Sequence, residues 1–363
     1  MDELTQATTA EPITVFDGHI DTLLRLRIEK RSFFERNDVG HVDLPRAREG
    51  HLGGAFCAVY IPSPGESVLS DPAEAARAVV AAFQDTTAPR AAPDLCYSQR
   101  VAIETMACLF RIDEESRGRV RVVRTAGQLE ACLQSGVFAA LLHFEGADAI
   151  DPDLNALEVF YQTGLRSLGP VHSRPNIFGQ GVPFKFPHSP DTGPGLTEAG
   201  KNLVRACNRL RIMIDLSHLT ERGFWDVAKL TDAPLVATHS NAHALTPATR
   251  NLTDKQLAAI RESDGMVGVN FHVGFLRADG SSDQDTPLED IVRHIDYLVD
   301  HLGIERVGLG SDFEYIAVPR ELGDATGLPK LFALLHRRGY DEDALAKLAH
   351  KNWLRVLRKT WEG

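Results

Sequence analysis

Histidine and carboxylate side chains directly follow several short apolar runs in this sequence. His19 and Asp21 close the first run, and Glu145, His218 and His239 each end a later one. Because alternate residues of a strand point to the same side, the side chains of His19 and Asp21 would face one point. Imidazole nitrogens combined with carboxylate oxygens are ligands that suit zinc or a similar divalent ion.

A further carboxylate, Asp312, ends the last apolar run. Any one of these residues, taken singly, could equally be a hydrogen-bonded residue at the rim of a fold. Their recurrence at the ends of several runs favours metal binding instead. Five or six ligands exceed one tetrahedral site, but two metal ions about 3.5–4 Å apart that share a carboxylate would use them all.

The remaining histidines are not expected to bind metal. His143 lies two residues before Glu145, so it should point the same way but deeper, and His272 should be a rim residue. Five others look like helix or surface residues: His243, His294, His301, His336 and His350.

The short apolar runs of the sequence predict eight strands. They span residues 13–21, 54–61, 137–146, 165–172, 211–218, 234–240, 265–272 and 306–313. Their nearly continuous apolar character is typical of parallel strands that are covered on both faces, and helix-like segments separate most of them. The pattern predicts a (β/α)8 TIM-type barrel, in which functional side chains gather at the C-terminal strand ends.

An open doubly wound sheet is the competing architecture, and it would normally carry a glycine-rich phosphate turn after its first strand. The chain reads DGHIDT there instead. The segment GLTEAGKN (195–202) imitates a phosphate loop but ends in Asn202, where the loop needs Ser or Thr. The segment GLGSDF (308–313) is too short for a dinucleotide fingerprint and is better interpreted as a close approach to Asp312.

The predicted organisation is one domain over residues 1–363. A Pro- and Gly-rich loop at about 173–196 should pass over the barrel mouth, and helices at about 341–361 should pack on the barrel wall. Residues 63–120 should hold two helices. Capping boxes predict helix starts at Asp71 with Glu74 and at Thr253 with Gln256.

Composition narrows the classes of partner. The net charge of −11 argues against nucleic acid or an anionic membrane surface and favours a small-molecule substrate. The five widely spaced cysteines indicate a reduced chain without a disulfide framework. The first ten residues lack the features of a secretory signal, and no apolar run approaches the roughly 20 residues of a spanning helix, so a cytoplasmic location is expected.

Longer motifs give the chain a family resemblance. They include DGHID (17–21), FEGAD (144–148), GLRSLGPVH (164–172), PLVATHSNAHAL (234–245), RNLTD (250–254) and HIDYLVDHLGIERVGLGSDF (294–313). With the segment 195–227, they resemble the renal (membrane) dipeptidase family, the zinc peptidase family M19, over nearly the whole chain. The part from 195 to 313 is the most specific.

The resemblance implies two Zn²⁺ ions per chain. His19, Asp21 and Glu145 would hold one ion, and Glu145, His218 and His239 would hold the other, so that Glu145 bridges them. A metal-bridging hydroxide would then attack the scissile carbonyl of a dipeptide, and the family suggests tolerance of a D-residue on the C-terminal side.

Three more residues acquire expected roles from the same resemblance. His172 matches a histidine that contacts the substrate and stabilises the oxyanion, and Arg250 matches an arginine that faces the substrate carboxylate. Asp312 matches the acid that transfers protons. A homodimer is implied by the family alone.

Two loops depart from the family pattern. The chain reads SDFEY where the family usually has SDFDG, and it carries Arg174 and Pro175 after His172. These departures leave open an alternative, a related hydrolase of N-acyl amino acids or similar small amides or lactones. A binding protein that keeps the barrel without catalysis is a third hypothesis, which the complete set of ligands disfavours.

Overall fold

The strands of this protein lie at its centre and run parallel. A computed structural model describes residues 13–64 and 92–363. Within them the strands are β1 (Val15–Ile20), β2 (Leu52–Tyr60), β3 (Val120–Val123), β4 (Phe138–Glu145), β5 (Ser167–Gly169), β6 (Met213–Ile214), β7 (Val236–Ala237), β8 (Met266–Val269) and β9 (Val307–Leu309). Each of the eight predicted runs overlaps one of these strands, and β2 begins two residues before its predicted run.

The strands form a curled sheet of the barrel type. One sheet has the order β1-β2-β4-β5-β6 and the other the order β7-β8-β9. Parallel bridges join them at both seams, between Asp215 and Val236 and between Ile20 and Phe313. The order of neighbours around the ring therefore follows the sequence, as the barrel prediction requires.

Strand β3 was not predicted. It pairs with the first half of β4, from Val120 opposite Phe138 to Val123 opposite Leu141, and β5 pairs with the second half of β4. The strand has four residues, one of them an exposed arginine. So short and interrupted a run gives no periodic signal that distinguishes it from a loop.

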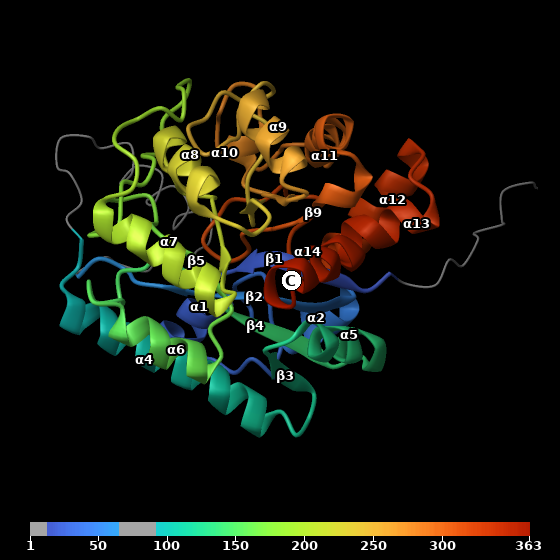
Figure 1. The fold of residues 1–363 in the computed structure, drawn as a ribbon. Coiled ribbons are helices and arrows are strands. Elements are labelled where there is room, and N and C mark those ends of the chain that lie inside the picture. Colours follow the sequence, from blue (N-terminus) through green and yellow to red (C-terminus); the bar gives the residue numbers. More distant parts are fainter. Residues whose placement is uncertain (1–12, 65–91) are drawn as a thin grey trace, which may run out of the picture.

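Helices surround the strands (Figure 1). They are α1 (Thr22–Glu29), α2 (Leu44–Glu49), α4 (Leu95–Glu115), α5 (Ala126–Ser135), α6 (Asn155–Thr163), α7 (Glu198–Leu210), α8 (Glu221–Leu230), α9 (Asp254–Glu262), α10 (Val273–Leu276), α11 (Glu289–Leu302), α12 (Leu328–Arg338), α13 (Glu342–Ala346) and α14 (Asn352–Trp361). Short 3-10 turns occupy Ile304–Arg306 and Ala325–Gly327, and a π-helical turn, Lys347–Lys351, joins α13 to α14.

Several helix predictions can be compared with these bounds. The capping box of Thr253 and Gln256 is present at the start of α9. The second helix expected in 63–120 is α4, whereas the first, with the predicted cap at Asp71, lies outside the described residues. No helix in residues 13–64 and 92–363 combines the length and hydropathy that crossing a bilayer requires.

Helix α14 does more than cover the barrel wall. Its Trp353 is fully buried in a cluster with Phe16 and Phe56, and its Nε1 donates a hydrogen bond to the carbonyl oxygen of Leu309 at 3.0 Å. A Cβ atom on Gly18 would lie 2.4 Å from the indole, so glycine is needed there. The C-terminal helix thus holds β1 and β9 in place beneath their functional ends.

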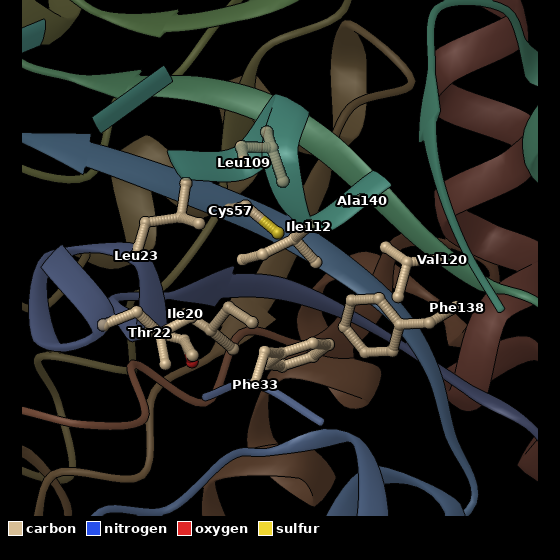
Figure 2. Close-up of a pocket in the computed structure, with 11 residues that line it drawn as sticks. Ile20, Thr22, Leu23, Phe33, Cys57, Leu109, Ile112, Val120, Phe138 and Ala140 are labelled. Carbon is tan, nitrogen blue, oxygen red and sulfur yellow. The ribbon is translucent and has the colours of Figure 1, made fainter. Parts of the chain in front are cut away.

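The apolar layer between sheet and helices encloses a small pocket (Figure 2). Figure 2 shows Ile20 of β1, Cys57 of β2 and Ala140 of β4 meeting Leu109 and Ile112 of α4. Burial raises the pKa of the Cys57 thiol to about 12, so this thiol is an inert core group. All five cysteines of the chain are free.

Candidate metal centre

The strand ends bring the predicted site residues together. His19 lies in β1, Glu145 is the last residue of β4, and Asp21, His172, His218, His239 and Asp312 follow the ends of β1, β5, β6, β7 and β9. All of them are buried, as is Arg250. Parallel strands of a closed sheet end on the same side, so residues distant in sequence converge there.

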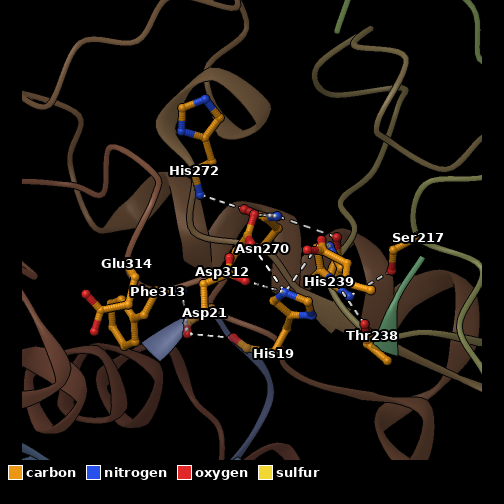
Figure 3. Close-up of polar contacts among 12 residues, drawn as sticks. His19, Asp21, Ser217, Thr238, His239, Asn270, His272, Asp312, Phe313 and Glu314 are labelled. Atoms are coloured by element: carbon orange, nitrogen blue, oxygen red, sulfur yellow. Dashed lines mark hydrogen bonds and ion pairs between the residues drawn. The ribbon is translucent and has the colours of Figure 1, made fainter. Parts of the chain in front are cut away.

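His19 lies among three carboxylates, of which Figure 3 labels those of Asp21 and Asp312. Its Nε2 atom is 3.7 Å from Asp21 Oδ1, 3.6 Å from Glu145 Oε1 and 3.8 Å from Asp312 Oδ1. Within the described residues, neither His19 Nε2 nor Asp21 Oδ1 has a hydrogen-bond partner, although both atoms are buried. Buried polar atoms normally have a partner, and a cation among these atoms would supply one.

A second cluster shares Glu145 with the first. Glu145 Oε1 lies 2.9 Å from His218 Nε2 and 3.5 Å from His239 Nε2. The two Nε2 atoms are 3.0 Å apart. Two ligand triads, one with His19 and Asp21 and one with His218 and His239, therefore meet at one carboxylate.

The hydrogen bonds around His239 determine its tautomer. Thr238 Oγ1 lies 2.6 Å from Asp215 Oδ2 and 2.8 Å from His239 Nδ1. The hydroxyl donates its one proton to the carboxylate, so it must accept from Nδ1–H of the imidazole. The Nε2 atom of His239 then carries a lone pair that faces Glu145 and His218. Lone pairs that converge in this way need a cation between them.

The electrostatic potential at His19 is strongly negative. Burial opposes charge on this imidazole, but the carboxylates of Glu145, Asp21 and Asp312 outweigh it and raise the pKa of His19 to about 10. Burial raises the pKa of Glu145 well above its usual value, and Asp21 and Asp312 add to that effect. The carboxylates around His19 therefore favour a positive charge at this position.

The pKa values of His218 and His239 shift in the opposite direction to that of His19. Burial, with the nearby cation of Arg250, holds the pKa of each well below its usual value. Both imidazoles are consequently neutral at physiological pH, which is the form that binds metal.

Asp312 is fixed on two sides. Its Oδ2 accepts a hydrogen bond from Asn270 Nδ2 at 2.8 Å, and its backbone N–H donates to the His19 carbonyl oxygen at 3.0 Å. Its φ of 64° lies in the left-handed region. Burial raises the pKa of its carboxyl, which favours proton transfer at this position.

His172 and Arg250 border the two clusters. His172 Nε2 is 3.8 Å from Glu145 Oε1. Arg250 Nη2 is 3.4 Å from His218 Nε2 and 3.2 Å from the His239 carbonyl oxygen, and its guanidinium lies 5.6 Å from the ring centre of Phe275. A buried cation beside an apolar ring is suited to a substrate carboxylate.

Comparison with known proteins agrees with this geometry. The sequence model of the membrane dipeptidase family, peptidase family M19, matches residues 5–362. The chain belongs to this family. It is therefore a metallopeptidase that hydrolyses the peptide bond of dipeptides, on a TIM-like barrel.

Individual relatives cover most of the chain. A metallopeptidase from Rhodobacter sphaeroides, solved with a phosphinate mimic of the dipeptide L-Ala-D-Ala, is 49% identical with a TM-score of 0.90 over 97% of this chain and all of that one. The family M19 dipeptidase AC gives 49% and 0.89 over the same shares. An uncharacterized protein of the pqqA 5′ region of Klebsiella pneumoniae is 52% identical over 71% of this chain and 96% of that protein.

Sequence reasoning missed the residues that orient the predicted metal ligands and Asp312 in this dipeptidase. They are Asp215 and Thr238 beside His239, Ser173, whose hydroxyl is 2.8 Å from His218 Nδ1, and Asn270 beside Asp312. A signal was available for Thr238, because this hydroxyl residue directly precedes His239 in ATHS. Ser217 precedes His218 in the same way, but its hydroxyl bonds Asp215 and the His239 N–H instead.

Three other histidines of the dipeptidase are also buried. His143 lies beneath His19, as expected, with Nδ1 2.9 Å from Ser167 Oγ and ring centres 5.4 Å apart. His272 is buried and precedes α10. His294 was grouped with helix or surface residues; it lies on α11 but is fully buried, where it accepts from the Ala242 N–H at 3.2 Å.

Proposed function

We propose that this protein is a two-zinc dipeptidase. His19 and Asp21 would hold one Zn²⁺, His218 and His239 the other, and Glu145 would bridge them. The observation that carries this proposal is the meeting of two buried ligand triads at a single carboxylate. The mixture of neutral imidazole and carboxylate donors suits zinc.

The bound metals would supply a water of lowered pKa and a Lewis acid for the scissile carbonyl. Asp312 takes the proton of the attacking water and passes it to the leaving amine, since its Oδ1 is only 3.8 Å from His19 Nε2. His172 donates a hydrogen bond to the oxygen that becomes negative during attack. Its ring lies 4.3 Å from the His218 ring, which supports a position beside the reacting carbonyl.

Arg250 selects substrates with a free C-terminal carboxylate. Its buried guanidinium can form two parallel hydrogen bonds with that group. A long peptide would place an uncharged amide against the same buried cation, so short substrates are favoured. The Rhodobacter relative with its L-Ala-D-Ala mimic supports acceptance of a C-terminal D-residue.

The free cysteines bear on the compartment in which the enzyme works. Five free thiols support a reducing compartment, and we place the protein in the cytoplasm on that ground. A homodimer is the proposed assembly, which sedimentation of the purified protein would test.

The test is amine release from L,L- and L,D-dipeptides and from N-acyl amino acids by zinc-reconstituted protein. A chelated sample serves as the control, and metal content is measured in parallel. Chelator-sensitive dipeptide cleavage with two zinc ions per chain is expected. Activity on the acyl compounds alone would replace the proposed substrate, and full activity with one zinc would contradict the two-metal assignment.

A further inference from the structure

Glu314 is a buried carboxylate that lies two residues beyond Asp312 and outside the proposed metal centre. Its Oε2 is 3.1 Å from Arg25 Nε and 3.3 Å from Arg31 Nη2. Its Oε1 accepts from Thr22 Oγ1 at 3.3 Å. The side chain is fully buried, and in Figure 3 it lies on the side of Asp312 away from His19 and His239.

Glu314 also holds the segment between α1 and α2. Its carboxylate accepts the backbone N–H of His41 at 3.2 Å and of Val42 at 2.9 Å. In return, its own N–H donates to His41 Nδ1 at 2.9 Å, and its carbonyl oxygen lies 3.4 Å from Arg25 Nη2. The residue is therefore fixed through both its side chain and its backbone.

The backbone at this point is strained. Glu314 has a φ of 119° and Asp312 a φ of 64°, both in the region that favours glycine. Such a conformation costs on the order of 1–3 kcal/mol per residue and persists only where the surroundings hold it. The sequence departs from the family pattern at this same place, with Glu314 and Tyr315 where Asp-Gly is usual.

The segment from Asp312 to Glu314 is anchored on its other side by β1. The N–H of Asp312 donates to the His19 carbonyl oxygen, and the N–H of Asp21 donates to the Phe313 carbonyl oxygen, each at 3.0 Å. The residues from Asp312 to Glu314, which we call the strap, are thus held by β1 on one side and by the contacts of Glu314 on the other. The direction in which the Asp312 carboxylate points depends on the conformation of that strap.

We propose that Glu314 is a positioning residue for dipeptide hydrolysis. By holding the strap from the far side, it keeps Asp312 in the left-handed conformation from which its carboxylate reaches the metal centre. This inference rests on the proposed role of Asp312 in proton transfer. Glu314 itself touches neither the ligand triads nor the substrate carboxylate site.

Glu314→Gln is the direct test. The amide is similar in size and can still accept from the Val42 N–H, but it carries no charge for Arg25 and presents one acceptor fewer. We expect two zinc ions per chain, a KM within about twofold and a kcat lower by on the order of tenfold, because small misplacement of a reacting group is costly. A crystal structure of the variant should show the Asp312 carboxylate displaced.

Glu29→Gln is the matched control. Glu29 also pairs with Arg25, at 2.6 Å, and with Arg31, at 3.3 Å, but it does not contact the strap. This variant should keep the wild-type kcat. An equal loss of kcat in both variants would assign the effect to the arginines and overturn the positioning role.

His41 offers a milder pair of variants should Glu314→Gln fail to fold. His41→Asn retains an acceptor for the Glu314 N–H, whereas His41→Leu does not. A lower kcat in the Leu variant, rescued in the Asn variant with zinc content unchanged, is the expected result. Equal kcat values in the two would contradict the inference.

A double variant separates this inference from the proposed function. If Glu314 acts through Asp312, adding Glu314→Gln to Asp312→Asn should leave the residual rate unchanged. A further loss would show an independent effect. Were the wild type inactive on dipeptides, the proposed function would fail, but the conformation of Asp312 in the Glu314→Gln crystal would still decide the positioning role.

Discussion

The hydroxyl of Thr238 lies 2.8 Å from Nδ1 of His239 and obliges that nitrogen to be the donor. The donor assignment follows because the hydroxyl proton is committed to Asp215, 2.6 Å away. The protonation of the nitrogen that faces the proposed metal position is thus determined by a neighbour that belongs to neither ligand triad. Such supporting contacts are often worth about 10–100-fold in metal affinity.

Thr238→Val should therefore weaken zinc binding at the His218–His239 position by about 10–100-fold. Valine matches the shape of threonine but cannot accept from Nδ1–H, so the competing tautomer with Nε2–H becomes accessible. Competition with a chromophoric chelator measures the zinc affinity at each of the two metal positions. Thr105→Val in α4, which also removes a buried hydroxyl, is the control and should leave both unchanged. Unaltered zinc affinity in Thr238→Val would refute the tautomer argument.

Asp312→Asn should retain zinc and lose turnover. The amide still fits beside Asn270 and His19, but it cannot take a proton from water. We expect kcat to fall by about 100-fold or more, as for the loss of a general base. Steady-state kinetics with parallel elemental analysis would check this, and an unchanged kcat would remove Asp312 from the mechanism.

Arg250→Met should abolish the preference for a free C-terminal carboxylate. The wild type is expected to favour a dipeptide over its C-terminal amide, because a hydrogen-bonded charge pair contributes about 1.5–3 kcal/mol. That preference corresponds to roughly 10–100-fold in kcat/KM. The ratio of kcat/KM for the dipeptide to kcat/KM for its amide is measured in each enzyme, so each enzyme is its own control. The same ratio in the variant as in the wild type would show that Arg250 does not select the carboxylate.

His294 should make the fold sensitive to acid. Burial lowers its pKa to about 4, whereas the unfolded chain titrates near 6.5. As pH falls below about 6.5, only the unfolded state takes up the proton, so stability is lost until the folded pKa near 4 is reached, by up to roughly 3 kcal/mol.

Urea unfolding of the wild type and His294→Asn at several pH values isolates this effect, since contributions from other groups cancel in the difference. The stability advantage of the wild type should shrink as the pH is lowered from 7 to 4.5. A difference that stays constant with pH would exclude His294 as the cause.

The sequence predicted the barrel and the convergence of ligands for one physical reason. Parallel strands of a closed sheet end on the same side, so His19, Glu145 and His239 had to meet once their strands were recognised. Hydrogen bonds between side chains follow no such rule. The roles of Asp215 and Thr238 depend on rotamers and on the meeting of two loops, which spacing along the chain does not reveal.

Burial of polar residues was equally hard to predict. His294 was grouped with helix or surface residues, yet it is buried on its helix and its ring bonds the backbone of two other segments. The strap around Glu314 was anticipated only as a loop of altered shape. Its contacts join residues nearly 300 positions apart, such as Thr22 and Glu314, and no local pattern encodes them.

The seam between β1 and β9 also sets the order in which the enzyme can be completed during synthesis. The five proposed ligands lie within residues 19–239, but the bridge from Ile20 to Phe313 closes the ring. On a ribosome, the first strand can pair with β2 early, but almost three hundred further residues must follow before it meets its second neighbour at Phe313. Until then the nascent chain carries histidines and carboxylates without the enclosure that makes them a hydrolase, so peptide-cleaving activity can arise only after nearly all of the chain has emerged.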